Sequence, residues 1–332
     1  QVMLQAQNTL NNNFGSSASG LSMGQRDRNG NPIDTTAVID ANTIPIGLYS
    51  WKIDSRFGNV TFVPVDTLTH AFQNTNDTGG MTGQYNYLGN LGSPRLSRLF
   101  FDRRDASQFF FTDPYDLTVL RPEDIIFTNT LSPFTNLSYY KTFDSRNGEE
   151  RFKSYFAINA NKRFGVGFYI DYLYGRGLYA SQSTAFFNGG LFASYRGDKY
   201  NMHFIFNNDN LKMAENGGIA DDRYITNPLD MAEGKKEYKS YDIPTNLNKV
   251  WNHNTSYHVF MTQRYNLGFH KEKIDSVTKD SVRIIQEFVP VTSFIHTLQV
   301  DLNGRKYISY DDEQNQKYFE HNYLGNDSID KT

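Results

Sequence analysis

The side chains best suited to catalysis or metal binding are scattered along this chain. Its histidines are His70, His203, His253, His258, His270, His296 and His321. His253 and His258 lie in a run that alternates as a strand does, so they fall on opposite faces and cannot readily share a metal ion. The chain has no cysteine, no Gly-x-Ser-x-Gly nucleophile motif and no His-Glu-x-x-His metal motif. We therefore predict no enzyme, no metal site and no cofactor.

Two other segments have a chemical interpretation and a simpler structural one. Segment 27–34 (DRNGNPID) has oxygen ligands at alternate positions, as a calcium loop does. Pro32 stands where the glycine of such a loop belongs, so an ordinary Asn-Gly turn is favoured. The glycines of segment 79–94 lack the spacing, the Lys-Ser/Thr and the helix of a phosphate loop, and they predict a tight irregular segment.

The charged groups favour ion pairing and solvation over a nucleic-acid surface. Arginines interleave with aromatic residues in the stretch 95–104, but Asp102 and Asp105 offset their charge, so we expect local ion pairs. The adjacent acids of 149–150 and 221–222 are more simply solvated charge in loops. A net charge of −3 provides no overall field that would attract nucleic acid.

The stretch 152–208 contains two hairpin-like units whose runs alternate between apolar and polar residues. In one run, Phe164, Val166, Phe168, Ile170, Tyr172 and Tyr174 share one side, and Gly165, Gly167, Tyr169 and Asp171 share the other. Such alternation over about ten residues predicts strands that can cross a bilayer when tilted. Aromatic residues gather at the run ends, as at a membrane interface, while the opposite face is small and polar, as in a lumen. We favour a transmembrane β-barrel wall over a soluble antiparallel sandwich.

The composition agrees with a barrel and argues against a helical membrane protein. Aromatic residues make up 15% of the 332 residues, and no run approaches the roughly 20 apolar residues that a membrane helix requires. Residues 1–45 are rich in Asn, Ser and Gly and predict a flexible arm. Residues 46–72 predict a compact β-unit, because Tyr49, Trp51 and Ile53 alternate before a turn.

Three segments carry a resemblance to a known family. They are Asp66–Leu68 (DTL), Tyr87–Pro94 (YLGNLGSP) and Thr128–Tyr139 (TNTLSPFTNLSY). They resemble the "putative porin" family of Bacteroidetes outer membranes over residues 46–310. The resemblance implies a barrel in the lipid bilayer of the outer membrane, with the N-terminal region in the periplasm. Because family members are about twice as long and end in an aromatic strand, we expect this chain to be the N-terminal half of a longer one.

We predict an all-β chain in three parts. These are a flexible arm (1–45), an N-terminal periplasmic or plug region (46–133), and the first half of a transmembrane β-barrel (134–332). Strands are expected at 136–143, 152–161, 163–174, 184–196, 199–208, 251–268 and 291–302. Outer loops of such barrels are long and inner turns are short, so 209–248 is expected as an outer loop. The charged segment 270–289 is expected as a periplasmic insert, with a small hairpin as its structure. Seven strands cannot close an even-numbered barrel, so its remaining strands are expected in the missing half.

Two functions of different classes fit these features. The first is a porin for passive diffusion of small polar solutes, whose lumen is lined by Lys153, Asn159, Asp171, His203 and Arg264. The second is a plugged or scaffold barrel that serves as a partner subunit for other outer-membrane or periplasmic proteins. We favour the porin because of the family resemblance. A distant third is a secreted soluble β-protein.

The resemblance also adds a modification signal. Envelope proteins of that bacterial group are O-glycosylated at Asp-Ser/Thr followed by an aliphatic residue or Thr. Matches occur at Thr35, Thr67, Ser276, Ser281 and Ser328. We predict O-glycosylation at these positions, four of which lie in segments assigned to the periplasm.

Overall fold

The computed structural model describes residues 47–65, 78–80, 82–143, 148–232, 239–278, 281–310 and 313–319, and the structural statements below concern these residues. The chain divides after Pro45, and every described residue belongs to the part that begins at Ile46. Strands dominate this part, which confirms the prediction of an all-β fold. No described helix is both long enough and apolar enough to cross a membrane.

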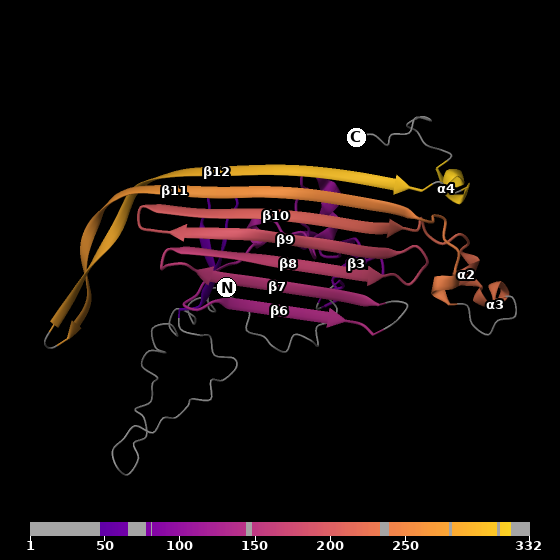
Figure 1. Ribbon diagram of the computed structural model, residues 1–332, viewed down its shortest axis with the longest axis horizontal. Coiled ribbons are helices and arrows are strands. Elements are labelled where there is room, and N and C mark those ends of the chain that lie inside the picture. Colours follow the sequence, from indigo (N-terminus) through magenta and orange to yellow (C-terminus); the bar gives the residue numbers. More distant parts are fainter. Residues whose placement is uncertain are drawn as a thin grey trace, which may run out of the picture. The chain divides into compact units, whose positions relative to one another are not determined.

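One large antiparallel sheet, called here the wall sheet, contains seven strands in the order β12-β11-β10-β9-β8-β7-β6. Each strand pairs with its neighbour in sequence, so the sheet is a meander (Figure 1). The strands are β6 (Phe134–Lys141), β7 (Glu149–Asn159), β8 (Phe164–Arg176), β9 (Ser183–Arg196), β10 (Tyr200–Glu215), β11 (Val250–Thr278) and β12 (Ser281–Ser309). The sheet is open, with β6 and β12 at its two edges.

Strand β10 is longer than the sequence pattern predicts. An outer loop was expected from residue 209, whereas β10 continues to Glu215 and pairs with both β9 and β11 along this length. Leu211 and Met213 are buried on the same face as Asp209. The loop was predicted because the residues 207–210 are all polar. The prediction was wrong because the backbone of these residues forms hydrogen bonds to both neighbouring strands.

Strands β11 and β12 also run through a segment that was expected to be separate from the sheet. The hairpin expected for the charged insert 270–289 is present, but it continues β11 and β12, which remain paired as far as Thr278 and Ser281. Figure 1 shows this hairpin reaching past the ends of β9 and β10. Lys271 lies opposite Glu287, and opposite charges in facing positions stabilise an antiparallel pair. The charge of the segment therefore supports the strands instead of ending them.

The N-terminal segment, defined here as residues 47–133, forms two small sheets and several short helical turns. Strands β1 (Tyr49–Ile53), β2 (Val60–Val63) and β5 (Phe127–Asn129) form one sheet in the order β2-β1-β5. Strands β3 (Tyr85–Tyr87) and β4 (Arg95–Ser97) form a separate hairpin. The 3-10 helices are η2 (Phe100–Asp102), η3 (Phe110–Tyr115) and η4 (Pro122–Asp124). The predicted β-unit thus exists, but β5, far along the chain, completes it.

Connections at one end of the wall sheet are short and those at the other end are longer. Residues 160–163 join β7 to β8, and residues 197–199 join β9 to β10. The connection from β10 to β11 spans 216–249 and carries short helices. These are α2 (Arg223–Thr226), α3 (Pro228–Met231) and η5 (Ser240–Asp242), and α4 (Glu313–Tyr318) follows β12. Barrels of the outer membrane show this same asymmetry.

The two faces of the wall sheet differ in chemistry, and it is the polar face that is buried. Asn188 and Asn207 expose 0% and 2% of their surfaces, although both are polar. On the opposite face, Leu191 and Leu302 expose 56% and 64%. A sheet surrounded by water buries its apolar face, whereas a lipid bilayer solvates that face. The arrangement therefore suits a membrane wall and disfavours a soluble sandwich.

Candidate functional site: the inner face of the wall sheet

The five residues predicted to line a lumen share one face of the wall sheet. The pairing register places Lys153, Asn159, Asp171, His203 and Arg264 on this side. It is the polar face, called here the inner face, and the N-terminal segment packs against it. The structure thus brings the five residues to one side but gives most of them contacts with protein.

His203 contacts the first strand of the N-terminal segment. Trp51 Nε1 donates a hydrogen bond to His203 Nε2 at 3.1 Å, so the imidazole carries its proton on Nδ1 when it is neutral. Phe127 stacks on Trp51, with ring centroids 5.9 Å apart and planes 15° apart. Because Trp51, Phe127 and His203 are all buried, this contact anchors β1 and β5 to strand β10.

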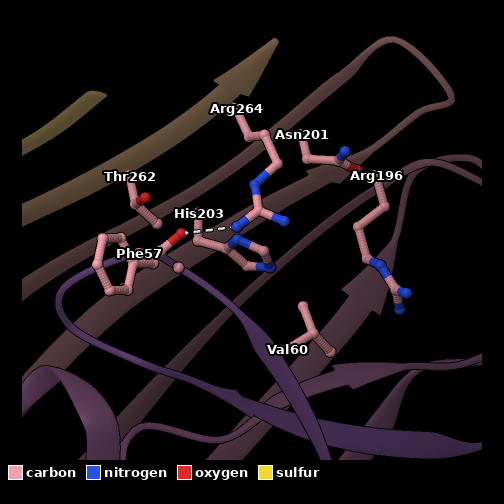
Figure 2. A pocket seen from close by; sticks show the side chains of 8 residues that line it. Phe57, Val60, Arg196, Asn201, His203, Thr262 and Arg264 are labelled. Atoms are coloured by element: carbon pink, nitrogen blue, oxygen red, sulfur yellow. Dashed lines mark hydrogen bonds between the residues drawn. The ribbon is translucent and has the colours of Figure 1, made fainter. Parts of the chain in front are cut away.

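Arg264 and Asn159 bond to other parts of the N-terminal segment. Arg264 Nη2 donates to the Phe57 carbonyl oxygen at 3.0 Å (Figure 2). The same nitrogen donates to Asn59 Oδ1 at 2.6 Å. Asn159 Nδ2 donates to Asn129 Oδ1 at 2.9 Å. The polar groups expected to face solutes are therefore used to hold the N-terminal segment.

Asp171 forms a buried ion pair on the same face. Arg151 donates to Asp171 from Nε at 2.9 Å and from Nη2 at 2.6 Å. Arg151 Nη2 also donates to the Leu117 carbonyl oxygen at 3.1 Å, which ties the pair to the N-terminal segment. Lys153 lies opposite Asp171 in the register and is exposed. The ion pair of Arg151 and Asp171 therefore links β7, β8 and the N-terminal segment.

Two apolar clusters complete the contact between the N-terminal segment and the inner face. In both clusters, residues of the N-terminal segment pack on inward-facing residues of the wall sheet. The first cluster contains Trp51, Ile53, Ile125, Phe127, Ala157, Tyr169, Phe192, Ile205 and Phe260, and the second contains Leu91, Tyr115, Leu173, Phe186, Leu211 and Met213. Burial in the second cluster raises the pKa of Tyr115, since it disfavours the charged phenolate.

The inward apolar residues of the wall sheet were not singled out from the sequence, although a signal for them exists. Phe186, Phe192, Ile205 and Phe260 each have apolar neighbours on both sides in sequence, which interrupts the alternation. Consecutive apolar residues in a strand indicate that both faces are covered. Such runs therefore identify the places where a polar lumen face is covered by protein.

The Leu-Gly-Asn-Leu-Gly-Ser-Pro stretch, residues 88–94, lies against the wall sheet. Leu91 N–H donates to Glu149 Oε1 at 2.8 Å, and Thr184 Oγ1 donates to the Leu91 carbonyl oxygen at 2.6 Å. Gly92 has φ +76°, and a Cβ there would come within 2.6 Å of the side chain of Leu173. Only glycine suits this close approach. Glu149 was predicted to be a solvated charge in a loop. This prediction was wrong, because Glu149 is half-buried in β7 and accepts the hydrogen bond from Leu91 N–H.

Two arginines of the stretch 95–104, Arg95 and Arg104, form ion pairs within the N-terminal segment. Arg95 Nε lies 2.5 Å from Asp116 Oδ1, and Arg104 Nη1 lies 2.8 Å from Asp124 Oδ2. Their partners come from later in the N-terminal segment instead of from the neighbouring Asp102. The ion pairs therefore fold this segment on itself.

The loop acids at 221–222 lie at the surface. Asp221 accepts hydrogen bonds from Arg223, with the shortest at 2.6 Å. These bonds lower the pKa of Asp221. This arrangement agrees with the prediction that these acids are solvated charge in a loop.

The histidines of β11 lie on opposite faces, as the alternation predicts. His253 Nε2 is 2.9 Å from Asn210 Oδ1, whereas His258 Nδ1 is 2.7 Å from Asp301 Oδ1 on the inner face. His258 Nε2 also approaches Asp209, which is buried, to 3.5 Å. Asp209 had been assigned to a loop, so this network was not foreseen. Within the described ranges, no group of His, Asp or Glu side chains could hold a metal ion.

The predicted O-glycosylation positions are distributed unevenly over the structure. Thr35, Thr67 and Ser328 lie outside the described residues. Ser276 and Ser281 lie in β11 and β12, close to the point where the two strands join.

A strand meander with an apolar outer face and a polar inner face defines the class of outer-membrane β-barrel proteins. A family model described as "Putative porin" matches residues 47–332, and the chain therefore belongs to this family. This confirms the resemblance inferred from the sequence. Searches of curated proteins and of solved structures gave no significant match. Family membership supports an outer-membrane, porin-like role and a non-enzymatic channel.

Proposed function

We propose that the protein is an outer-membrane porin whose lumen is narrowed by its own N-terminal segment. Small polar solutes diffuse through the space that this segment leaves. The observation that supports the proposal is the covering of the inner face: its polar residues bond to the N-terminal segment, while the apolar face is left for lipid. In the membrane, the short turns 160–163 and 197–199 face the periplasm. The N-terminal segment then lies inside the barrel, not in a separate periplasmic domain.

The contacts favour a fixed constriction over a mobile gate. Detaching β1 and β5 would expose Trp51 and Phe127, and burial of a large apolar side chain is worth about 1.5–3 kcal/mol. Detachment would also leave His203 and Arg264 without the partners they have in the N-terminal segment. We infer that solutes pass beside the N-terminal segment while it stays in place.

A disulfide between the N-terminal segment and the wall sheet tests this arrangement. Gly58 lies beside Thr262, and a Cβ at Gly58 would be 3.2 Å from Thr262 Cβ. Disulfides join Cβ atoms about 3.5–4.5 Å apart, so the double variant Gly58→Cys/Thr262→Cys needs a small shift of the two Cβ atoms. Gly58 has φ +63°, so a cysteine there also costs about 1–2 kcal/mol of backbone strain. The chain has no other cysteine to compete. We expect rapid cross-linking in the folded protein and none in a control with cysteine at exposed Phe101 in place of Gly58.

Planar-bilayer conductance then separates the functional alternatives. We expect stepwise conductance from the full-length protein and larger steps when residues 47–133 are deleted. The oxidised and reduced forms of the Gly58→Cys/Thr262→Cys variant should conduct equally if the constriction is fixed. A loss of conductance on oxidation would show that the segment must move.

A scaffold barrel without transport is the second candidate. It is favoured by the two apolar clusters, because an inner face with many buried apolar residues leaves fewer polar groups for solutes. A folded barrel that migrates anomalously on gels until heated, yet is silent in the bilayer, would contradict the porin proposal. Co-purifying outer-membrane or periplasmic proteins would then be the next object of study.

We further propose O-glycosylation at Ser276 and Ser281, on the hairpin that projects past β10. The expected result is an intact mass above that of the bare polypeptide. Changing both serines to alanine should lower this mass by far more than the loss of their two hydroxyl oxygen atoms. The matched control is Ser293→Ala, which lies in the same hairpin without a preceding aspartate. A mass equal to the bare polypeptide, for protein purified from its native source, would rule the modification out.

A further inference from the structure

A cavity of about 200 Å³ lies between the β1–β2 turn and the inner face of the wall sheet. Figure 2 shows the side chains around it, with those of the N-terminal segment facing those of the strands. The wall sheet contributes Arg196, Asn201, His203, Thr262 and Arg264, and the N-terminal segment contributes Phe57, Gly58 and Val60. The cavity lies beside the contacts that hold the N-terminal segment, because His203 and Arg264 line it and also bond to that segment.

The charge of this cavity is positive. The register places Asn201 opposite both Arg196 and Arg264, so these three residues lie side by side on three adjacent strands. None of the described residues that line the cavity is acidic. Among the described residues, neither arginine belongs to an ion pair. Two cations held close together in a partly buried space disfavour each other unless an anion balances them.

Arg196 is held in a way that leaves hydrogen-bond donors available. Its Cζ lies over the ring of Trp51, 4.8 Å from the ring centroid, which is a cation–π contact. Its Nη1 is buried without a hydrogen-bond partner among the described residues. A guanidinium in a cation–π contact keeps the N–H donors that lie in its plane. Carboxylates and phosphates bind to these donors.

Arg264 is held differently but offers the same chemistry. Both of its hydrogen bonds to the N-terminal segment come from Nη2, at 3.0 and 2.6 Å. The guanidinium has further N–H donors in the same plane. The Asn201 amide between the two arginines can add another donor, and a planar array of this kind matches the oxygen atoms of an oxyanion.

We propose that this cavity binds a small oxyanion, such as inorganic phosphate or a short carboxylate, between Arg196 and Arg264. Its volume equals that of about six or seven water molecules, which accommodates such an anion. Because the ligand would contact both the wall sheet and the β1–β2 turn, it would tighten the attachment of the N-terminal segment. The site rests on these contacts alone, so a barrel that does not conduct would leave it intact.

Tryptophan emission provides a direct readout. The chain has two tryptophans, so Trp251→Phe leaves Trp51, which stacks under Arg196, as the single reporter. The full-length Trp251→Phe protein in detergent is titrated with sodium phosphate, with sodium acetate, and with sodium chloride at equal ionic strength. Matching ionic strength removes the general screening of surface charge. We expect a saturable change in Trp51 emission with phosphate, acetate or both, and none with chloride.

Variants locate the site. Arg196→Gln should weaken oxyanion binding at least about tenfold, because it removes a charge-assisted pair of hydrogen bonds. Arg163→Gln is the matched control, since Arg163 is exposed, pairs with Asp198 and lies outside the cavity, and it should bind as before. If Arg196→Gln does not fold, Arg196→Lys keeps the charge without the planar fork and should still lose affinity.

The outcomes are decisive. A phosphate response without an acetate response assigns a phosphate-bearing ligand, and equal responses assign oxyanions in general. A linear response that matches chloride would overturn the proposal, as would binding that is unchanged in Arg196→Gln. Either result would mean that stacking on Trp51 and bound water are sufficient for Arg196.

Discussion

Replacing Arg151 with alanine is expected to destabilise the folded protein by about 3–5 kcal/mol. The Arg151 side chain is 4% exposed and its partner Asp171 is 13% exposed, so the substitution leaves a carboxylate with little solvent. It also removes the hydrogen bond to the Leu117 carbonyl oxygen. Lys153 faces Asp171 but is exposed, so it restores only part of the charge balance.

Equilibrium unfolding in denaturant, with the protein in detergent, measures this effect as a shift of the midpoint at constant slope. Arg163→Ala is the matched control. Its ion pair with Asp198 has both side chains more than half exposed, at 55% and 58%, and such pairs are worth about 0–1 kcal/mol. Equal midpoints for the two variants would contradict the structural role of the Arg151 pair.

Replacing Trp51 with alanine is expected to release the N-terminal segment from the wall sheet. Removing a buried tryptophan costs about 3–5 kcal/mol, and the His203 ring loses its hydrogen-bond donor. A loss of about 3 kcal/mol in the local opening free energy raises the open population by roughly a hundredfold. The rate of proteolytic cleavage within residues 47–133 should rise accordingly.

Phe62→Ala is the control for this experiment. Phe62 lies opposite Trp51 in the β1–β2 pair, but 56% of its surface is exposed. Its removal should cost less than about 1 kcal/mol and should leave cleavage nearly unchanged. Heat-modifiable migration shows in parallel whether the wall sheet stays folded. Equal cleavage rates in the two variants would mean that Trp51 does not hold the segment.

These two experiments probe different parts of one interface. Arg151 joins the wall sheet to the N-terminal segment at Leu117, and Trp51 joins them at His203. The first contact is electrostatic and the second is mainly apolar. If the N-terminal segment is a fixed constriction, both substitutions should also enlarge the conductance steps of the full-length protein, whereas their controls should not.

The amino-acid sequence by itself determined where most strands lie and which of their residues share a face, although not the full lengths of β10, β11 and β12. Phe164 to Tyr174 alternate with period two, and this periodicity is a property of neighbouring residues that does not depend on the rest of the fold. For the same reason, the sequence correctly placed Asn159, His203 and Arg264 on one face. The same rule places His253 and His258 on opposite faces of the sheet.

Only the tertiary structure decided what covers the inner face. Trp51 and His203 lie 152 positions apart, and no local pattern relates them. The sequence predicted Glu149 as solvated charge in a loop, whereas it accepts a hydrogen bond from Leu91 N–H. The sequence predicted an outer loop from residue 209, whereas the backbone there pairs with β9 and β11. Alternation shows that a face is polar, but solvent and a second polypeptide segment can both satisfy polar groups. Which of the two does so depends on contacts between distant residues, and these exist only in the folded chain.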